Sequence, residues 1–293
     1  MNVRIESQLG ADGGGYAWSA TAVSREESLE PDARGGENPR QVYDPFVDAP
    51  LLFWEFSQVK PAKEAVLDFA NHRGLLVGTH YSGRVGGNTL AAWCAEIEVM
   101  RFAIEVQSAL ARGDDEALGK TVIWDDGTDR PRYVTPAALE NLKRSWTGQQ
   151  RAHEITLFSH GALTAPAERL VQDIIEWKTQ SPKAQFFFGA ADEPEIIVRV
   201  DELRQVVWFQ FALAVRGRGL RFCAHCGRPF VMNVRSDQTL CSKNCTVLDT
   251  YHRKKKAQRM RADGVSVREI AKAVGAKTRS LKENMAQVKK WID

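Results

Sequence analysis

Four of the five cysteines in this 293-residue chain lie close together, at Cys223, Cys226, Cys241 and Cys245. The C-x2-C and C-x3-C spacings suit tetrahedral coordination of one Zn²⁺ by four thiolates, because each pair can point both sulfurs at one ion. Four thiolates leave no open position for water, so we expect a structural zinc ion. Disulfides are the rival interpretation. The first residues have no apolar core of a secretory signal, so we predict a reduced, cytoplasmic site.

The segments around the cysteines must aim the four sulfurs at one point. Gly227 supplies unhindered backbone directly after the first pair, as a tight knuckle requires. Residues 237–239 read as a turn, and Ser242 can cap a helix. Cys241 and Cys245 are then one helical turn apart and face the same way. A knuckle followed by a cysteine pair at the start of a helix is the outline of a treble-clef zinc module.

Positive charge is concentrated from Arg221 onward. Residues 221–293 carry 17 Lys and Arg against 6 Asp and Glu, a formal charge of +11, whereas residues 1–220 carry 23 against 31. A basic tail on an acidic body points to a polyanionic partner, most often nucleic acid. A basic run can also be a plain solvated face. The residues that we expect to contact phosphates are Arg253, Lys254, Lys255, Lys256 and Arg259.

A second DNA-type pattern follows from Gly264 onward. Ser266 and Glu269 form a capping box that starts one helix, Gly275 is the turn, and a second helix is expected from about Lys277 with Leu281 inward. Two short helices joined by a glycine turn predict a helix-turn-helix, and a helical hairpin that merely packs is the rival. The residues expected to contact base edges are Lys277, Thr278, Arg279, Ser280 and Lys282.

The segment from about 200 to 254 resembles the bacterial CGNR-type zinc-finger family. The resemblance is carried by the cysteine pattern, by Gly-Arg-Pro-Phe230 after Cys226, and by Tyr251-x-Arg253-Lys254 in the following helix. It implies an α-rich sensor domain followed by a DNA-binding zinc module that acts in transcription. Thr-Val-Leu follows Cys245, where the family has Gly-Asn-Arg. The end of the chain resembles the helix-turn-helix of resolvases.

The preceding residues predict an α+β body that is mostly α-helical. Helices are expected at 61–74, at 88–111, after Pro166 and at 203–215, the last capped by Asp201. Strand pairs are expected at 121–124 with 132–134 and at 185–188 with 195–198. The predicted organisation is a poorly ordered segment at 1–45, a sensor or assembly domain at 46–218, a zinc finger at 219–260 and a helix-turn-helix at 261–293.

These patterns predict a zinc-dependent DNA-binding regulator that is not an enzyme, since no nucleophile and base lie together in the sequence. An effector, either a small molecule or a protein, is expected at the body. A homodimer is one way to extend the short DNA contact of a single helix-turn-helix. No run is long enough to cross a membrane. An RNA-binding or ribosome-associated protein remains open, and so does an enzyme of nucleic acid metabolism that uses the tail for targeting.

Overall fold

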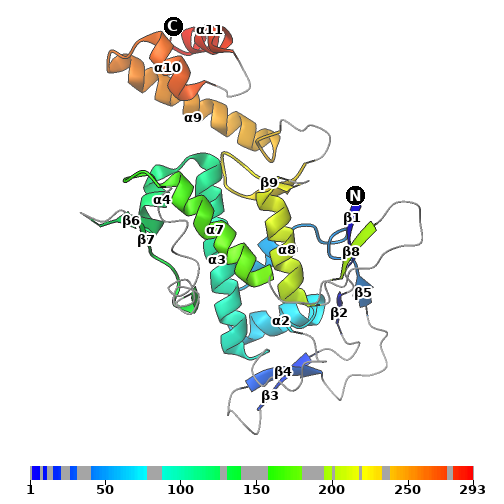
Figure 1. Ribbon diagram of the computed structural model, residues 1–293. Helices are drawn as coiled ribbons and strands as arrows, with labels where there is room; N and C mark the ends of the chain where they lie inside the picture. Colours follow the sequence, from blue (N-terminus) through cyan, green and yellow to red (C-terminus); the bar gives the residue numbers. More distant parts are fainter. Residues whose placement is uncertain are drawn as a thin grey trace.

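The computed structural model describes residues 2–6, 9–11, 16–20, 27–31, 41–77, 88–125, 131–139, 158–179, 195–199, 202–217, 220–232, 238–275 and 280–292. The fold is mostly helical, with short strands in two-stranded sheets. The described helices between residues 52 and 215 build a body, and those between residues 243 and 292 stand apart from it beyond the cysteine segment (Figure 1). Within the described part of the chain, no helix combines the length and apolar character needed to cross a bilayer.

The longest helix of the body is α3 (Leu90–Arg112), and the other body helices pack around it. The Thr89 side chain caps its start by accepting a hydrogen bond from the Ala92 amide at 3.2 Å. Gly113 ends it in the left-handed conformation, at φ 64°. Fully buried residues recur along one stripe, including Trp93 and Ile97. The helix predicted at 88–111 is therefore confirmed.

Four further helices complete the core of the body. They are α1 (Leu52–Gln58), α2 (Lys63–Arg73), α7 (Thr164–Thr179) and α8 (Leu203–Val215). Helix α7 begins two residues before Pro166, which the first turn of a helix tolerates because its amides lack intrahelical partners. The short α4 (Asp115–Thr121) links α3 to the predicted hairpin of β6 (Val122–Trp124) and β7 (Pro131–Tyr133), followed by the 3₁₀ turn η2 (Ala137–Leu139).

A buried glutamine joins two body helices that are distant in sequence. Gln210 of α8 is 1% exposed, and its side-chain oxygen accepts a hydrogen bond from the Phe53 amide at 3.2 Å. Its nitrogen donates to the carbonyl oxygens of Pro45 and Ala49, at 2.7 and 2.9 Å. No side chain of its own segment caps α1. Gln210 therefore bonds the Phe53 amide in the first turn of that helix, as well as two carbonyl groups of the segment that leads into it.

Short strands occur among the described residues of the segment predicted to be poorly ordered, 1–45. They are β1 (Asn2–Glu6), β2 (Leu9–Ala11), β3 (Tyr16–Ala20), β4 (Glu27–Pro31) and β5 (Gln41–Tyr43). Strand β2 pairs with β5 and β3 with β4, both antiparallel. The prediction of little structure rests on the polar composition of the segment. Composition does not report which segments pair.

The strand predicted at 195–198 is present as β8 (Glu195–Arg199), and it has a partner that the sequence did not predict. It pairs in parallel with β1, in the register Asn2 to Glu195, across most of the chain. Residues 185–188 lie outside the described residues, as does Asp201. The N-cap of α8 is Glu202, which makes no side-chain capping bond. The Arg204 amide instead donates to the carbonyl oxygen of Leu76 at 3.1 Å.

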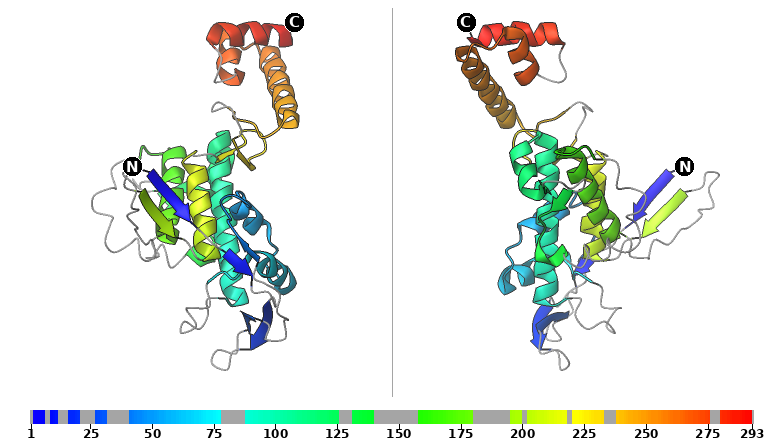
Figure 2. Two further views of the ribbon diagram at one scale, coloured as in Figure 1. Left: turned by 90° about the vertical axis from the view of Figure 1, so that its right-hand side faces the viewer. Right: turned by 60° about the vertical axis from the view of Figure 1, so that its left-hand side comes forward.

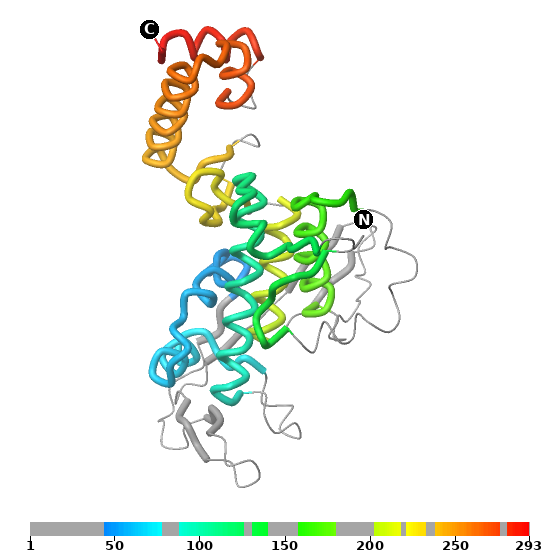
Figure 3. Tube along the Cα trace, turned by 90° about the vertical axis from the view of Figure 1, so that its left-hand side faces the viewer, coloured from blue at the N-terminus to red at the C-terminus, as the bar shows by residue number. Residues whose placement is uncertain are grey.

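The C-terminal unit consists of α9 (Lys243–Ala262), α10 (Val267–Val274) and α11 (Leu281–Ile292). Helices α10 and α11 pack on the far end of α9, and the three share a small core separate from that of the body (Figures 2 and 3). The capping box of Ser266 and Glu269 is confirmed. The last helix begins at Leu281 rather than near Lys277, and Leu281 is 37% exposed rather than inward.

Candidate metal centre and basic helix

The four predicted cysteines lie together, and their sulfurs are all within 4.8 Å of one another. Sγ of Cys241 lies 3.7 Å from Sγ of Cys226 and 3.4 Å from Sγ of Cys245. Four sulfurs at about 2.3 Å from a tetrahedral zinc ion would be about 3.8 Å apart. In the described part of the chain, no other group of His, Cys, Asp and Glu side chains approaches this closely. The donor set therefore fits one structural zinc ion.

The thiols differ in how readily they ionise. Burial disfavours the Cys223 thiolate, but the amides of Cys226, Cys241 and His225 donate to its sulfur and bring its pKa down to about 7. Burial and the neighbouring sulfurs raise the pKa of Cys241 to about 12. Thiols this close cannot all ionise unless a cation compensates their charge. A bound Zn²⁺ would supply that charge and would hold all four as thiolates.

Two short strands and a left-handed glycine build the first half of the site. Strands β9 (Leu220–Phe222) and β10 (Pro229–Val231) pair antiparallel and hold the knuckle that carries Cys223 and Cys226. The Gly227 amide donates to the carbonyl oxygen of Cys223 at 2.9 Å, and Gly227 adopts φ 70°. This confirms the prediction that the knuckle needs a glycine at this position, because residues with a side chain rarely adopt that backbone conformation.

The knuckle rests directly on the body. Ser108 of α3 donates a buried hydrogen bond of 2.7 Å to the carbonyl oxygen of Gly227. A Cβ atom on Gly227 would lie 3.1 Å from Cβ of Ser108 and would meet the Arg112 guanidinium. Phe222, one residue before the first ligand, belongs to the body core and packs edge-on against Phe211 at 6.3 Å. The four-cysteine site is thus continuous with the body rather than held on a free linker.

The second half of the site is the start of α9. Ser242 is its N-cap, and its hydroxyl accepts a hydrogen bond from the Cys245 amide at 3.2 Å. This capping role is the one predicted from the sequence. The Cys241 amide also lies 3.4 Å from Sγ of Cys223, which ties the two cysteine pairs together. The metal site therefore fixes where α9 begins and in which direction it leaves the body.

Helix α9 carries most of the predicted phosphate contacts on its exposed surface. Seven of its residues are Lys or Arg, and its single acidic residue, Asp249, pairs with Arg253 at 3.4 Å. Lys254, Lys255, Lys256 and Arg259 are exposed. The other predicted contacts are those to base edges. Ser280 and Lys282 are exposed at the start of α11, whereas Lys277, Thr278 and Arg279 lie outside the described residues.

Arg253 differs from its basic neighbours because its guanidinium is engaged within the protein. Its Nε donates to the carbonyl oxygen of Val274 at 2.6 Å, and the group lies 5.6 Å from the centre of the Trp291 ring. The hydrogen bond satisfies a backbone carbonyl group at the C-terminal end of α10, and the ring contact ties α9 to α11. Gly275 follows that end, and a Cβ atom there would lie 2.5 Å from Nδ2 of the buried Asn284. Only glycine permits this close approach.

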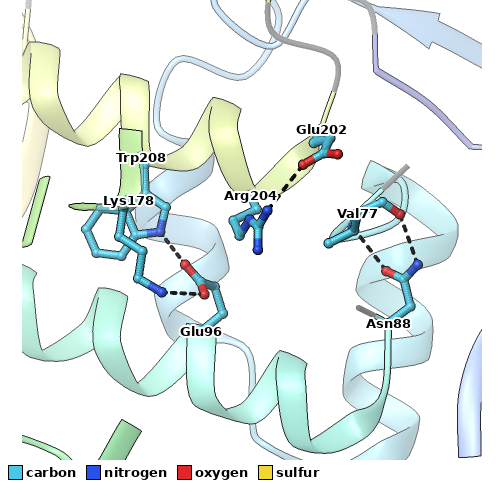
Figure 4. Close-up of polar contacts among 7 residues, drawn as sticks. All are labelled: Val77, Asn88, Glu96, Lys178, Glu202, Arg204 and Trp208. Atoms are coloured by element: carbon cyan, nitrogen blue, oxygen red, sulfur yellow. Dashed lines mark hydrogen bonds and ion pairs between the residues drawn. The ribbon is translucent and has the colours of Figure 1, made fainter. Parts of the chain in front are cut away.

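The body contains a buried polar group that sequence reasoning missed. Glu96 of α3 pairs with Lys178 of α7 at 2.6 Å, and the two side chains are 9% and 10% exposed. The Trp208 indole of α8 donates to the other oxygen of Glu96 (Figure 4). Burial lowers the pKa of Lys178, and the Glu96 carboxylate opposes this effect. The group joins three helices; nothing in the local sequence distinguishes Glu96 and Lys178 from surface charges.

Two histidines meet beside the metal site. The rings of His225, in the knuckle, and His252, on α9, stack at 5.5 Å, and Tyr251 lies edge-on to His252 at 5.7 Å. The stack adds a contact between the knuckle and the helix. Neither histidine belongs to a group of three or more potential metal ligands in the described residues. The group found there consists of the four cysteines alone.

The comparisons with known proteins add no relative to this picture. No protein-family model matches the chain, and neither the curated proteins nor the solved structures contain a match.

Proposed function

We propose that the protein is a zinc-dependent DNA-binding protein that acts as a transcriptional regulator. The observation that carries the proposal is the continuity of the four-cysteine group with a basic helix. Cys245 lies in the first turn of α9, and the same helix runs on into exposed Lys254, Lys255 and Lys256. Zinc would thereby order a rigid cationic surface, and binding such an ion supplies folding free energy on the order of 10 kcal/mol.

In this proposal the cysteine segment is a treble clef of the CGNR type, and the last two helices form a helix-turn-helix. The first interpretation is supported by the β9–β10 knuckle followed by a capped helix. The second is supported by the capping box of α10 and by its close crossing with α11 at Gly275. A compact three-helix unit with a cationic surface suits a DNA groove and its phosphates.

The body would be the regulatory part, because its core reaches the metal site. The contact from Ser108 to Gly227 and the packing of Phe222 connect α3 and α8 to the knuckle. A ligand or protein that changes the packing of these helices would alter the position of α9. Such coupling requires two arrangements of the contact between the body and the knuckle, one of which binds the effector more tightly than the other.

The experiment is a binding measurement on the zinc-loaded full chain with duplex DNA across a salt series. We expect log K to fall linearly with log salt, and binding to be lost on chelation and in Cys245→Ser. Cys94→Ser is the matched control, since Cys94 lies in α3 away from the metal site. Structured RNA is the competitor. Preference for that RNA would favour the RNA-binding alternative, and binding unaffected by chelation would refute the zinc requirement.

The proposal also divides the basic residues by role. Lys255→Ala should weaken binding to all sequences alike, because phosphate contacts carry no sequence information. Arg279→Ala should instead relax sequence preference. Equal losses on specific and random DNA for both variants would contradict this division.

A further inference from the structure

The first half of α9 exposes an apolar stripe that nothing in the described residues covers. Val247, Leu248 and Tyr251 are 67%, 47% and 49% exposed. At 100° per residue, the three lie on one side of the helix. Met260 and Arg253, through which α9 contacts α10 and α11, lie on the opposite side. The stripe therefore faces away from the helices that hold α9.

The stripe is surrounded by positive charge. Nζ of Lys255, one turn further along, lies 4.9 Å from the centre of the Tyr251 ring, and Lys254 and Arg259 are exposed beside it. The one acidic residue of α9 is paired with Arg253 on the other side of the helix. A second copy of α9 would bring like charges together. The surface instead fits a partner that is anionic and also offers apolar contacts.

Duplex DNA meets both requirements. An α-helix is about 10–12 Å across and fits the major groove, which is about 12 Å wide. In the groove, aliphatic side chains contact the methyl group of thymine, while lysines on either side reach the phosphates. We propose that the stripe of Val247, Leu248 and Tyr251 is a base-contacting surface of α9. This inference rests on the proposed function, and it adds a sequence-reading surface to the predicted one at residues 277–282.

The test compares two valine substitutions in the zinc-loaded full chain. Val247→Ser removes an apolar contact from the stripe, and Val47→Ser is the control because Val47 is similarly exposed, at 72%, but lies in the body. Selection from random duplexes, with sequencing, gives the preferred site. We expect Val247→Ser to lower the ratio of specific to random binding about tenfold, and to change random binding less than about twofold. Val47→Ser should leave both unchanged.

Tyr251→Ala is the second variant and should also reduce the preference. Zinc content and circular dichroism check that each variant folds, which is expected because the side chains are exposed. If the parent protein selects a sequence and both stripe variants select it equally well, the inference is overturned while the proposed function stands. A parent that binds DNA without preference also overturns the inference. If the parent protein does not bind DNA, both proposals are overturned, and this holds even if the protein binds anionic vesicles.

Discussion

At the scale of single residues, the most constrained position of the metal site is a glycine rather than a ligand. Gly227 must adopt φ 70°, and it must also leave room for Ser108 and Arg112 of the body. Its carbonyl oxygen accepts the buried Ser108 hydrogen bond. One residue therefore shapes the knuckle and docks it on α3, so a side chain there would disturb both the metal site and its support.

Gly227→Ala should lower the free energy of unfolding by about 1–3 kcal/mol from backbone strain, with a further loss because Arg112 must move. Gly161→Ala is the matched control: Gly161 has φ 82°, and a Cβ atom there would meet nothing within 4 Å. Chemical denaturation of the zinc-loaded proteins measures both effects. Equal losses in the two variants would mean that contact with the body adds nothing to the strain.

At the scale of elements, buried polar side chains reinforce the apolar packing at two groups of helix crossings. Glu96 holds α3 to α7 and α8 through Lys178 and Trp208. Arg253 holds α9 to α10 and α11 in a similar way. Apolar packing fills the space between such helices but leaves their rotation less defined, whereas a buried donor and acceptor must meet. Both contacts can be tested by removing one partner.

Lys178→Met should destabilise the body by roughly 3–5 kcal/mol, because it leaves the Glu96 carboxylate buried without a counter-charge. Adding Glu96→Gln should recover much of that loss, since glutamine is neutral and can still accept a hydrogen bond from Trp208. Thermal or urea unfolding of the two single variants and the double variant gives the coupling. Strictly additive losses would show that the two charges do not depend on each other.

Arg253→Ala and Lys254→Ala should have different consequences although the residues are adjacent. Loss of Arg253 removes a charged hydrogen bond to Val274 and should cost about 1.5–3 kcal/mol of stability in the C-terminal unit. Lys254 is exposed, so its removal should change stability by less than about 0.5 kcal/mol, but should lower the slope of log K against log salt by about 1. Unfolding curves and DNA titrations distinguish these roles. Unchanged stability in Arg253→Ala would contradict the anchoring role.

At the scale of the whole molecule, the metal site lies between two separate cores. The body core ends at Phe222, and the core of α9 to α11 begins around Ala257. The cysteine segment and the first turns of α9 connect them (Figure 3). The direction in which the basic helix leaves the body is therefore set by the geometry around the four sulfurs.

Zinc removal should be felt on both sides of the site, but not throughout the chain. Amide hydrogen exchange on the chelated protein should increase across β9, β10 and the start of α9, and also at the C-terminal ends of α3 and α8 that contact the knuckle. Helices α1 and α2 are the internal control and should keep their protection. An increase confined to residues 223–245 would show that the site and the body are independent.

The sequence by itself determined the features that depend on local spacing. The four cysteines, the Ser242 and Ser266 caps, and the body helices with strong apolar periodicity follow from contacts within one or two turns. The tertiary structure decided which distant groups meet: Gln210 at the start of α1, Glu96 with Lys178, and Ser108 with Gly227. It also decided that β8 pairs with β1, and that Arg253 faces inward while its basic neighbours face solvent. Such pairings depend on the packing of whole elements, and a residue carries no local sign of the partner that packing will bring to it.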